Sequence, residues 1–161
     1  MKKFDKKIQI RIIKITLIIV WMVIVFCFSN QGGTKSSNTS RKVTVAVVQV
    51  LSDRTIEEDE PLLENIEKII RKLAHYTIYA VGGFLIMNYA YTTNRKTKEK
   101  VFYSTAFGIG YAVTDELHQF FVAGRSASIF DVCIDALGIV TGIGIYVIMR
   151  KAIERLKDKA V

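Results

Sequence analysis

Long apolar segments alternate with short, strongly basic segments along this chain of 161 residues. Half of all residues are hydrophobic, and most charged side chains lie between the apolar segments. Each apolar segment approaches the roughly 20 residues that a helix needs to cross the hydrocarbon layer of a membrane. The sequence therefore predicts an all-α, polytopic membrane protein, with a single domain over residues 1–161. The four expected transmembrane helices cover residues 12–28, 73–91, 101–121 and 129–149.

The basic residues predict the orientation of these four spans. Lysines and arginines are concentrated in the N-terminal segment, in the loop 92–100 and in the C-terminal tail, whereas the loop 122–128 carries only Arg125. Short segments rich in lysine and arginine stay on the cytoplasmic side. We therefore expect a multi-pass protein of the cell membrane with both termini in the cytoplasm. Residues 29–72, between the first two spans, then lie outside.

The formal net charge of +8 indicates which partners to expect. In a soluble protein such a charge would indicate nucleic acid. Here the basic residues flank apolar segments, so anionic lipid headgroups are the simpler counter-charge. The expected partners are membrane lipids, with no nucleic acid.

The long external segment contains two parts with different patterns. Residues 43–60 begin as an apolar, β-branched run and end with several carboxylates, which suits an interfacial helix or a lid lying on the bundle. Pro61, the only proline, follows these carboxylates and is typical of a helix start. One long helix is expected from Pro61 through Tyr91, entering the membrane near Leu73.

Polar side chains gather at the external edge of three predicted spans. Ionisable groups at membrane depth are energetically expensive and are functional-site candidates by default. Three separate segments that place such groups at one depth therefore predict a polar site between the helices. On the predicted topology these groups are His75, Asp115, Glu116, His118, Gln119, Arg125, Asp131 and Asp135, with Arg71 on the same helix face as His75 and Tyr79.

Helical spacing also predicts which faces meet. Tyr111, Asp115, His118 and Gln119 share one face of the third span, with Glu116 turned to its side. In the fourth span, Asp131 and Asp135 are followed in the same register by Gly138 and Gly142. Such a small-residue face allows a neighbouring helix to approach closely.

Several of these residues have a purely structural alternative. Asp131 follows Ser128 by three positions, a capping-box arrangement. Asp135 needs a partner, and a salt bridge with Arg71, Lys72 or Arg125 would provide one. Those three cations are alternatively anchors in the headgroup region.

Asp115 and Glu116 are harder to explain structurally. They lie toward the C-terminal end of their helix, where the helix dipole disfavours negative charge. A histidine, an arginine, a metal ion or protonation must therefore compensate.

Three motifs resemble the VanZ-like family of bacterial membrane proteins. They are FSNQGG with the serines that follow (28–40), IRKLAHYTIYAVGG (70–83) and AVTDELHQFFVAGRSASIFDVCIDALGIVTG (112–142). The resemblance implies a small polytopic membrane protein, common in Gram-positive bacteria. The founding member is associated with low-level resistance to teicoplanin and related lipoglycopeptides, without the D-Ala-D-Lac replacement machinery. Tyr76 stands where the family usually has phenylalanine.

Three hypotheses about function follow. The preferred one is binding of an anionic cell-envelope lipid or lipid-linked cell-wall precursor on the external side, linked to teicoplanin resistance. Its expected ligand-binding residues are Arg71, His75, Gln119, Arg125, Asp131 and Asp135.

The second hypothesis is a membrane-embedded enzyme acting on a lipid-linked substrate. The catalytic candidates are Glu116, His118 and Asp115, with Glu116 as a general base alongside His118. No cofactor is expected; a metal, if bound, would be held by His75, His118 and Glu116. The third hypothesis is a structural protein without turnover, whose polar groups hold the helices together.

Overall fold

The chain forms a bundle of long helices. The computed structural model describes residues 2–32, 41–46, 61–125 and 127–159, and these residues contain helices and short connections without a strand. The predicted all-α class is therefore confirmed for the described residues. The long helices are α1 (Lys2–Ser29), α3 (Pro61–Ala90), α4 (Thr97–Phe120) and α5 (Ile129–Lys159).

The helix boundaries follow from local sequence signals. Helix α3 starts at Pro61 and ends one residue before the predicted end at Tyr91. Helix α5 continues about one-third of its length past its apolar part. An i,i+4 pair joins Arg150 to Glu154 there, with 2.8 Å between the guanidinium Nε and the carboxylate, and such pairs support exposed helix.

Two of the described helices are long and apolar enough to cross a membrane by length and composition, Lys6–Ser29 and Ile129–Lys159. Large hydrophobic side chains also cover the outside of the other two helices, among them Leu73 and Val81 on α3 and Phe107 and Leu117 on α4. A soluble protein rarely exposes so much contiguous apolar surface. The exterior of the bundle is therefore suited to a lipid environment.

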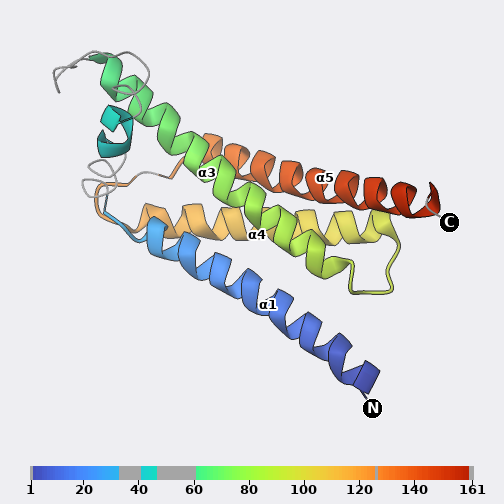
Figure 1. Ribbon diagram of the computed structural model, residues 1–161. Coiled ribbons are helices and arrows are strands. Elements are labelled where there is room, and N and C mark those ends of the chain that lie inside the picture. Colours follow the sequence, from blue (N-terminus) through green and yellow to red (C-terminus); the bar gives the residue numbers. More distant parts are fainter. Residues whose placement is uncertain (1, 33–40, 47–60, 126, 160–161) are drawn as a thin grey trace.

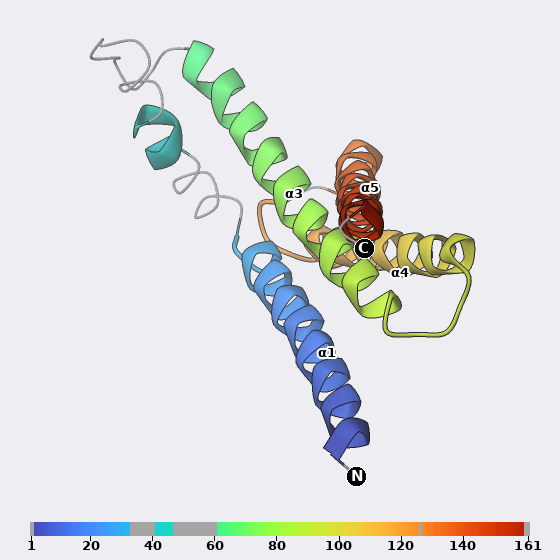
Figure 2. The ribbon, with the colours of Figure 1, turned by 45° about the vertical axis from the view of Figure 1, so that its right-hand side comes forward.

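One end of the bundle brings together parts of all four helices (Figure 1). The C-terminal ends of α1 and α4 and the start of α5 lie there beside the middle of α3, whose first turns extend beyond the other helices. Both chain termini lie at the opposite end. The loop between α3 and α4, which Figure 2 also shows, is at that opposite end, so the three basic segments of the chain share one end of the bundle in Figure 1.

Helices α3 and α5 pack most extensively against each other. The predicted small-residue face lies in this contact: a Cβ atom added at Gly138 would collide with the carbonyl oxygen of Tyr76, and one added at Gly142 would collide with that of Ala80. The two backbones are therefore in direct contact, as the sequence pattern indicated. This contact brings the turn of α3 that carries His75 next to the turn of α5 that carries Asp135.

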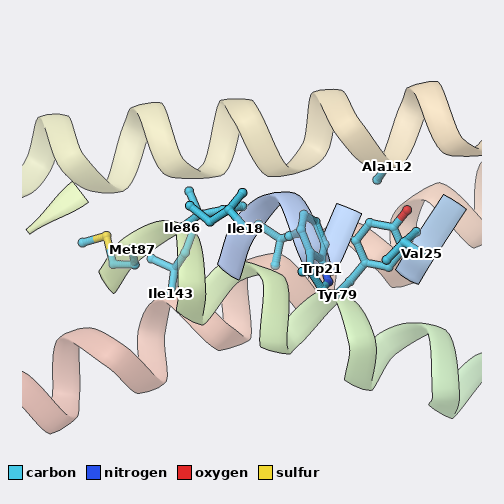
Figure 3. Close-up of a cluster of buried hydrophobic side chains, with 9 residues drawn as sticks. Ile18, Trp21, Val25, Tyr79, Ile86, Met87, Ala112 and Ile143 are labelled. Atoms are coloured by element: carbon cyan, nitrogen blue, oxygen red, sulfur yellow. The ribbon is translucent and has the colours of Figure 1, made fainter. Parts of the chain in front are cut away.

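Helix α1 is fixed to the bundle through a cluster of buried hydrophobic side chains that includes Trp21 and Tyr79 (Figure 3). Trp21 is almost fully buried, and its Nε1 donates a hydrogen bond of 2.8 Å to the carbonyl oxygen of Ile78 in α3. Its ring packs edge-on against Tyr79, with 5.8 Å between the centroids. The indole thus satisfies its polar group while burying its apolar surface.

Part of the expected lid is described. Residues 41–46 are helical, and Thr44 is buried while Val43 is half exposed. The rest of the expected interfacial segment, residues 47–60, lies outside the described residues.

The contact between α3 and α5 gives a matched test of stability. Gly142→Ala places a methyl group against the Ala80 carbonyl, whereas Gly144→Ala, half a turn away, meets no atom within 4 Å. We expect Gly142→Ala to lower the free energy of unfolding by about 1–3 kcal/mol, the usual effect of overpacking. Gly144→Ala should be neutral or stabilising, because alanine favours helix over glycine. Thermal unfolding in detergent measures both, and equal midpoints would contradict the close contact.

Candidate functional site

A polar cavity of about 140 Å³ lies at the end of the bundle where the four helices meet. All six residues predicted to bind a ligand line it, although they come from α3, α4, α5 and the loop between α4 and α5. Lys72, Gly124 and Ile134 complete the lining around Arg71, His75, Gln119, Arg125, Asp131 and Asp135.

The floor of the cavity contains a buried carboxylate without a hydrogen bond. Asp135 is fully buried, and neither of its oxygens has a hydrogen-bond partner among the described residues. Among the described residues, the ion-pair contact of Asp135 is with His75, with 3.6 Å between Nδ1 and Oδ1, and it carries opposite charges only when the imidazole is protonated. The expected salt bridge to Arg71, Lys72 or Arg125 is therefore wrong: the close packing of α3 and α5 places the histidine, and not a longer cation, beside this carboxylate.

Asp115 has the opposite environment, because one of its carboxylate oxygens accepts several hydrogen bonds. Its Oδ2 accepts hydrogen bonds from the hydroxyl of Ser29 at 2.8 Å, from the hydroxyl of Tyr79 at 3.0 Å and from Nε2 of Gln119 at 3.3 Å. These donors come from α1, α3 and α4. They compensate the charge that the C-terminal half of a helix disfavours, so Asp115 joins the three helices.

Arg125 extends this network to the cavity. One guanidinium nitrogen donates to Oε1 of Gln119 at 3.1 Å, and the others donate to the carbonyl oxygens of Gln31 at 3.2 Å and Phe28 at 3.4 Å. The last carbonyls of a helix lack partners within it. Arg125 therefore caps the C-terminal end of α1, and the left-handed backbone of Gly124, with φ of 75°, returns the chain toward that end.

Arg71 and Arg125 line the cavity together with the carboxylates of Asp131 and Asp135, so charges of both signs meet there. Partial burial and the nearby charge of Arg71 lower the pKa of Arg125, and neighbouring carboxylates only partly oppose this. The guanidinium still remains charged. An anion in the cavity would relieve the repulsion between the two cations.

Glu116 has a structural contact. Its Oε1 accepts a hydrogen bond of 2.6 Å from the backbone N–H of Ser128, at the start of α5. This is the bond that a capping box would have given to Asp131. The capping box is therefore replaced by a contact between α4 and α5, and Asp131 lines the cavity instead.

His118 does not reach the cavity. Its face of α4, shared with Tyr111, Asp115 and Gln119 as predicted, contacts α1: the imidazole lies on the ring of Phe26, with 4.8 Å between the centroids. The predicted metal set of His75, His118 and Glu116 is therefore not brought together. Among the described residues, no three histidine, cysteine or acidic side chains are close enough to hold a metal ion.

An apolar groove of about 240 Å³ adjoins the polar cavity. It runs between α1 and α3, and hydrophobic side chains such as Val25, Phe28 and Ile78 form most of its wall. Arg71, His75 and Arg125 line both the groove and the cavity. The combined site therefore has a charged part and an apolar part.

Sequence reasoning missed two members of the Asp115 network. Ser29 ends the most apolar helix and gave no signal of its own beyond its position in the FSNQGG motif. Tyr79 was placed on the face of Arg71 and His75, but its pairing with Asp115 depends on how α3 and α4 cross. Only the packing of the helices could show these contacts.

The fold and this site define a class: an all-helical, membrane-type bundle with a polar cavity, lined by charged side chains of both signs, at one end. The family model VanZ/LLP1 matches residues 14–150, which is most of the chain, and the protein belongs to this family. Comparison with curated proteins and with solved structures gave no match.

The two buried aspartates should differ in their effect on stability. Asp115→Ala removes the acceptor of the Ser29 and Tyr79 hydroxyls, whereas Nε2 of Gln119 keeps the Ser29 oxygen at 3.3 Å. Each group left unsatisfied costs about 1–3 kcal/mol. Asp135→Ala removes a carboxylate that has no hydrogen bond, so its replacement should cost far less, although it is the more deeply buried residue. Unfolding midpoints of the two variants test this. A larger loss for Asp135→Ala would show that Asp135 holds the fold together.

Proposed function

We propose that this protein spans the membrane four times and binds an anionic lipid-linked component of the cell envelope on the external side. The single observation that carries the binding proposal is that the polar cavity and the apolar groove share Arg71, His75 and Arg125. A lipid-linked phosphate has the same two parts, a charged head and an apolar chain. Arginine forks match phosphate geometry, and the groove offers a path for the first part of the chain.

The distribution of charge supports the four-span arrangement. At the end opposite the cavity, Arg11 donates a 2.8 Å hydrogen bond to the carbonyl of Thr92, and Lys14 donates one of 2.9 Å to that of Asn88. These cations cap the C-terminal end of α3 and belong with the basic loop and tail on the cytoplasmic side. The cavity then opens toward the outside, where lipid-linked cell-wall precursors are used.

This topology is tested with single cysteines in a chain that lacks Cys27 and Cys133. Ala123→Cys, in the exposed turn after α4, should react with a membrane-impermeant maleimide in intact cells. Lys96→Cys, in the opposite loop, should react only after permeabilisation. The reverse pattern would place the cavity on the cytoplasmic side.

Ligand binding is tested with a polyprenyl methylene-diphosphonate, which hydrolysis cannot consume, and the protein in nanodiscs of zwitterionic lipid. Arg71→Gln removes a cation that lines both parts of the site. We expect the Kd of this variant for the diphosphonate to rise about tenfold or more, because a hydrogen bond to a charged group contributes about 1.5–3 kcal/mol. Lys68→Gln is the matched control: it lies one turn away and pairs with Glu64 at 2.7 Å. Equal affinities for wild type and both variants would reject the proposed site.

The resemblance to VanZ-like proteins supports a link to lipoglycopeptide resistance. Teicoplanin susceptibility of a sensitive Gram-positive host then measures the role of the site in cells, with membrane abundance checked by blot. Wild type and Lys68→Gln should protect, whereas Arg71→Gln should be equally abundant and not protect. Protection by Arg71→Gln would show that resistance does not depend on this cavity.

A further inference from the structure

The two polar groups at the floor of the cavity are placed as a catalytic histidine and its orienting carboxylate. Asp135 is fully buried with both oxygens unpartnered, and Nδ1 of His75, also buried without a hydrogen bond, faces it at 3.6 Å. Nε2 is then the ring nitrogen available to the cavity that His75 lines. A buried carboxylate in this position fixes the tautomer of the histidine and stabilises the imidazolium that forms during proton transfer.

Burying a carboxylate without a hydrogen bond costs free energy. Two other acids near the cavity avoid this cost. Within the described residues, Asp115 accepts three hydrogen bonds, and Glu116 accepts one from a backbone N–H. Of these three acids, Asp135 is the one without a hydrogen bond, and it lines the cavity beside His75. Catalytic hydrogen bonds are often long in a ligand-free site and shorten when the ligand binds, which accounts for the 3.6 Å separation.

We infer that His75, positioned by Asp135, is the general base of a hydrolase that cleaves the phosphoanhydride of a lipid-linked diphosphate. This inference rests on the proposed function, because it assigns chemistry to the same anion site. Arg71 and Arg125 lie at the same cavity, where they stabilise the charge that develops on the phosphoryl oxygens.

The reaction is balanced with water as the only co-reactant. Nε2 of His75 takes a proton from a water molecule while the water oxygen forms a bond to the terminal phosphorus. The bond from that phosphorus to the bridging oxygen breaks, and its electron pair leaves with the lipid monophosphate. The imidazolium then releases its proton to the inorganic phosphate or to solvent. An anhydride suits this site because its leaving phosphate is a stable anion, so a single histidine is sufficient for the proton transfer.

Phosphate release from a polyprenyl diphosphate, by the purified protein in nanodiscs, tests the reaction. We expect wild type to release inorganic phosphate and His75→Gln to lose about 10²–10⁴-fold in rate, the usual contribution of general base catalysis. His118→Gln is the matched control, because the only other histidine lies on Phe26 and away from the cavity. Equal release by wild type and His75→Gln, or none by wild type, would overturn the inference.

Two further measurements separate chemistry from folding and from binding. His75→Gln keeps Arg71 and Arg125, so its Kd for the methylene-diphosphonate should rise far less than its hydrolysis rate falls, which separates the loss of chemistry from a loss of binding. Binding by wild type without His75-dependent hydrolysis would reject the hydrolase and leave the proposed binding function standing, whereas absence of binding would reject both.

The tautomer of His75 provides a separate test of the role of Asp135. In His118→Gln protein with ¹⁵N-labelled histidine, His75 gives the only imidazole signals. We expect the neutral ring to carry its proton on Nδ1, and Asp135→Asn to shift the tautomer toward Nε2 and to lower the hydrolysis rate. An unchanged tautomer in Asp135→Asn would overturn the positioning role of Asp135.

Discussion

The direct backbone contact between α3 and α5 is the constraint on which the site depends. Gly138 and Gly142 let α5 lie against the carbonyls of Tyr76 and Ala80, and this approach leaves no room for water or a longer side chain between the helices. His75 and Asp135, one turn further along, are therefore held beside each other. A wider separation of the helices would let Asp135 reach a solvated cation, and its carboxylate would then no longer be buried without a hydrogen bond.

The polar groups of the bundle divide into two sets with different physical roles. Asp115 is surrounded by donors from three helices, so its charge is used to hold the helices together. Asp135 is buried without such donors and lines a cavity. The structural hypothesis thus explains the first set and leaves the second unexplained. A protein that needed only cohesion would gain stability by replacing Asp135 with an apolar side chain.

Much of the fold and of the cavity could be predicted because the signals are local. Pro61 and the preceding carboxylates indicated the start of α3, and the spacing of Gly138 and Gly142 indicated a close contact. The prediction that His75, Arg125 and Asp135 lie at one depth followed from chain direction alone. The roles of Glu116 and His118 could not be predicted, because one turn of helix rotation decides whether a side chain faces the cavity, the start of α5 or the ring of Phe26.

Arg125 belongs to two parts of the molecule at once. Its guanidinium caps the end of α1 through the carbonyls of Phe28 and Gln31, and it also lines the cavity. Any ligand that draws these donors toward itself weakens their hold on α1, and any movement of α1 changes the donors offered to the ligand. If the proposed ligand binds there, occupancy of the cavity and attachment of the first helix are thermodynamically linked, and each alters the other by the same free energy.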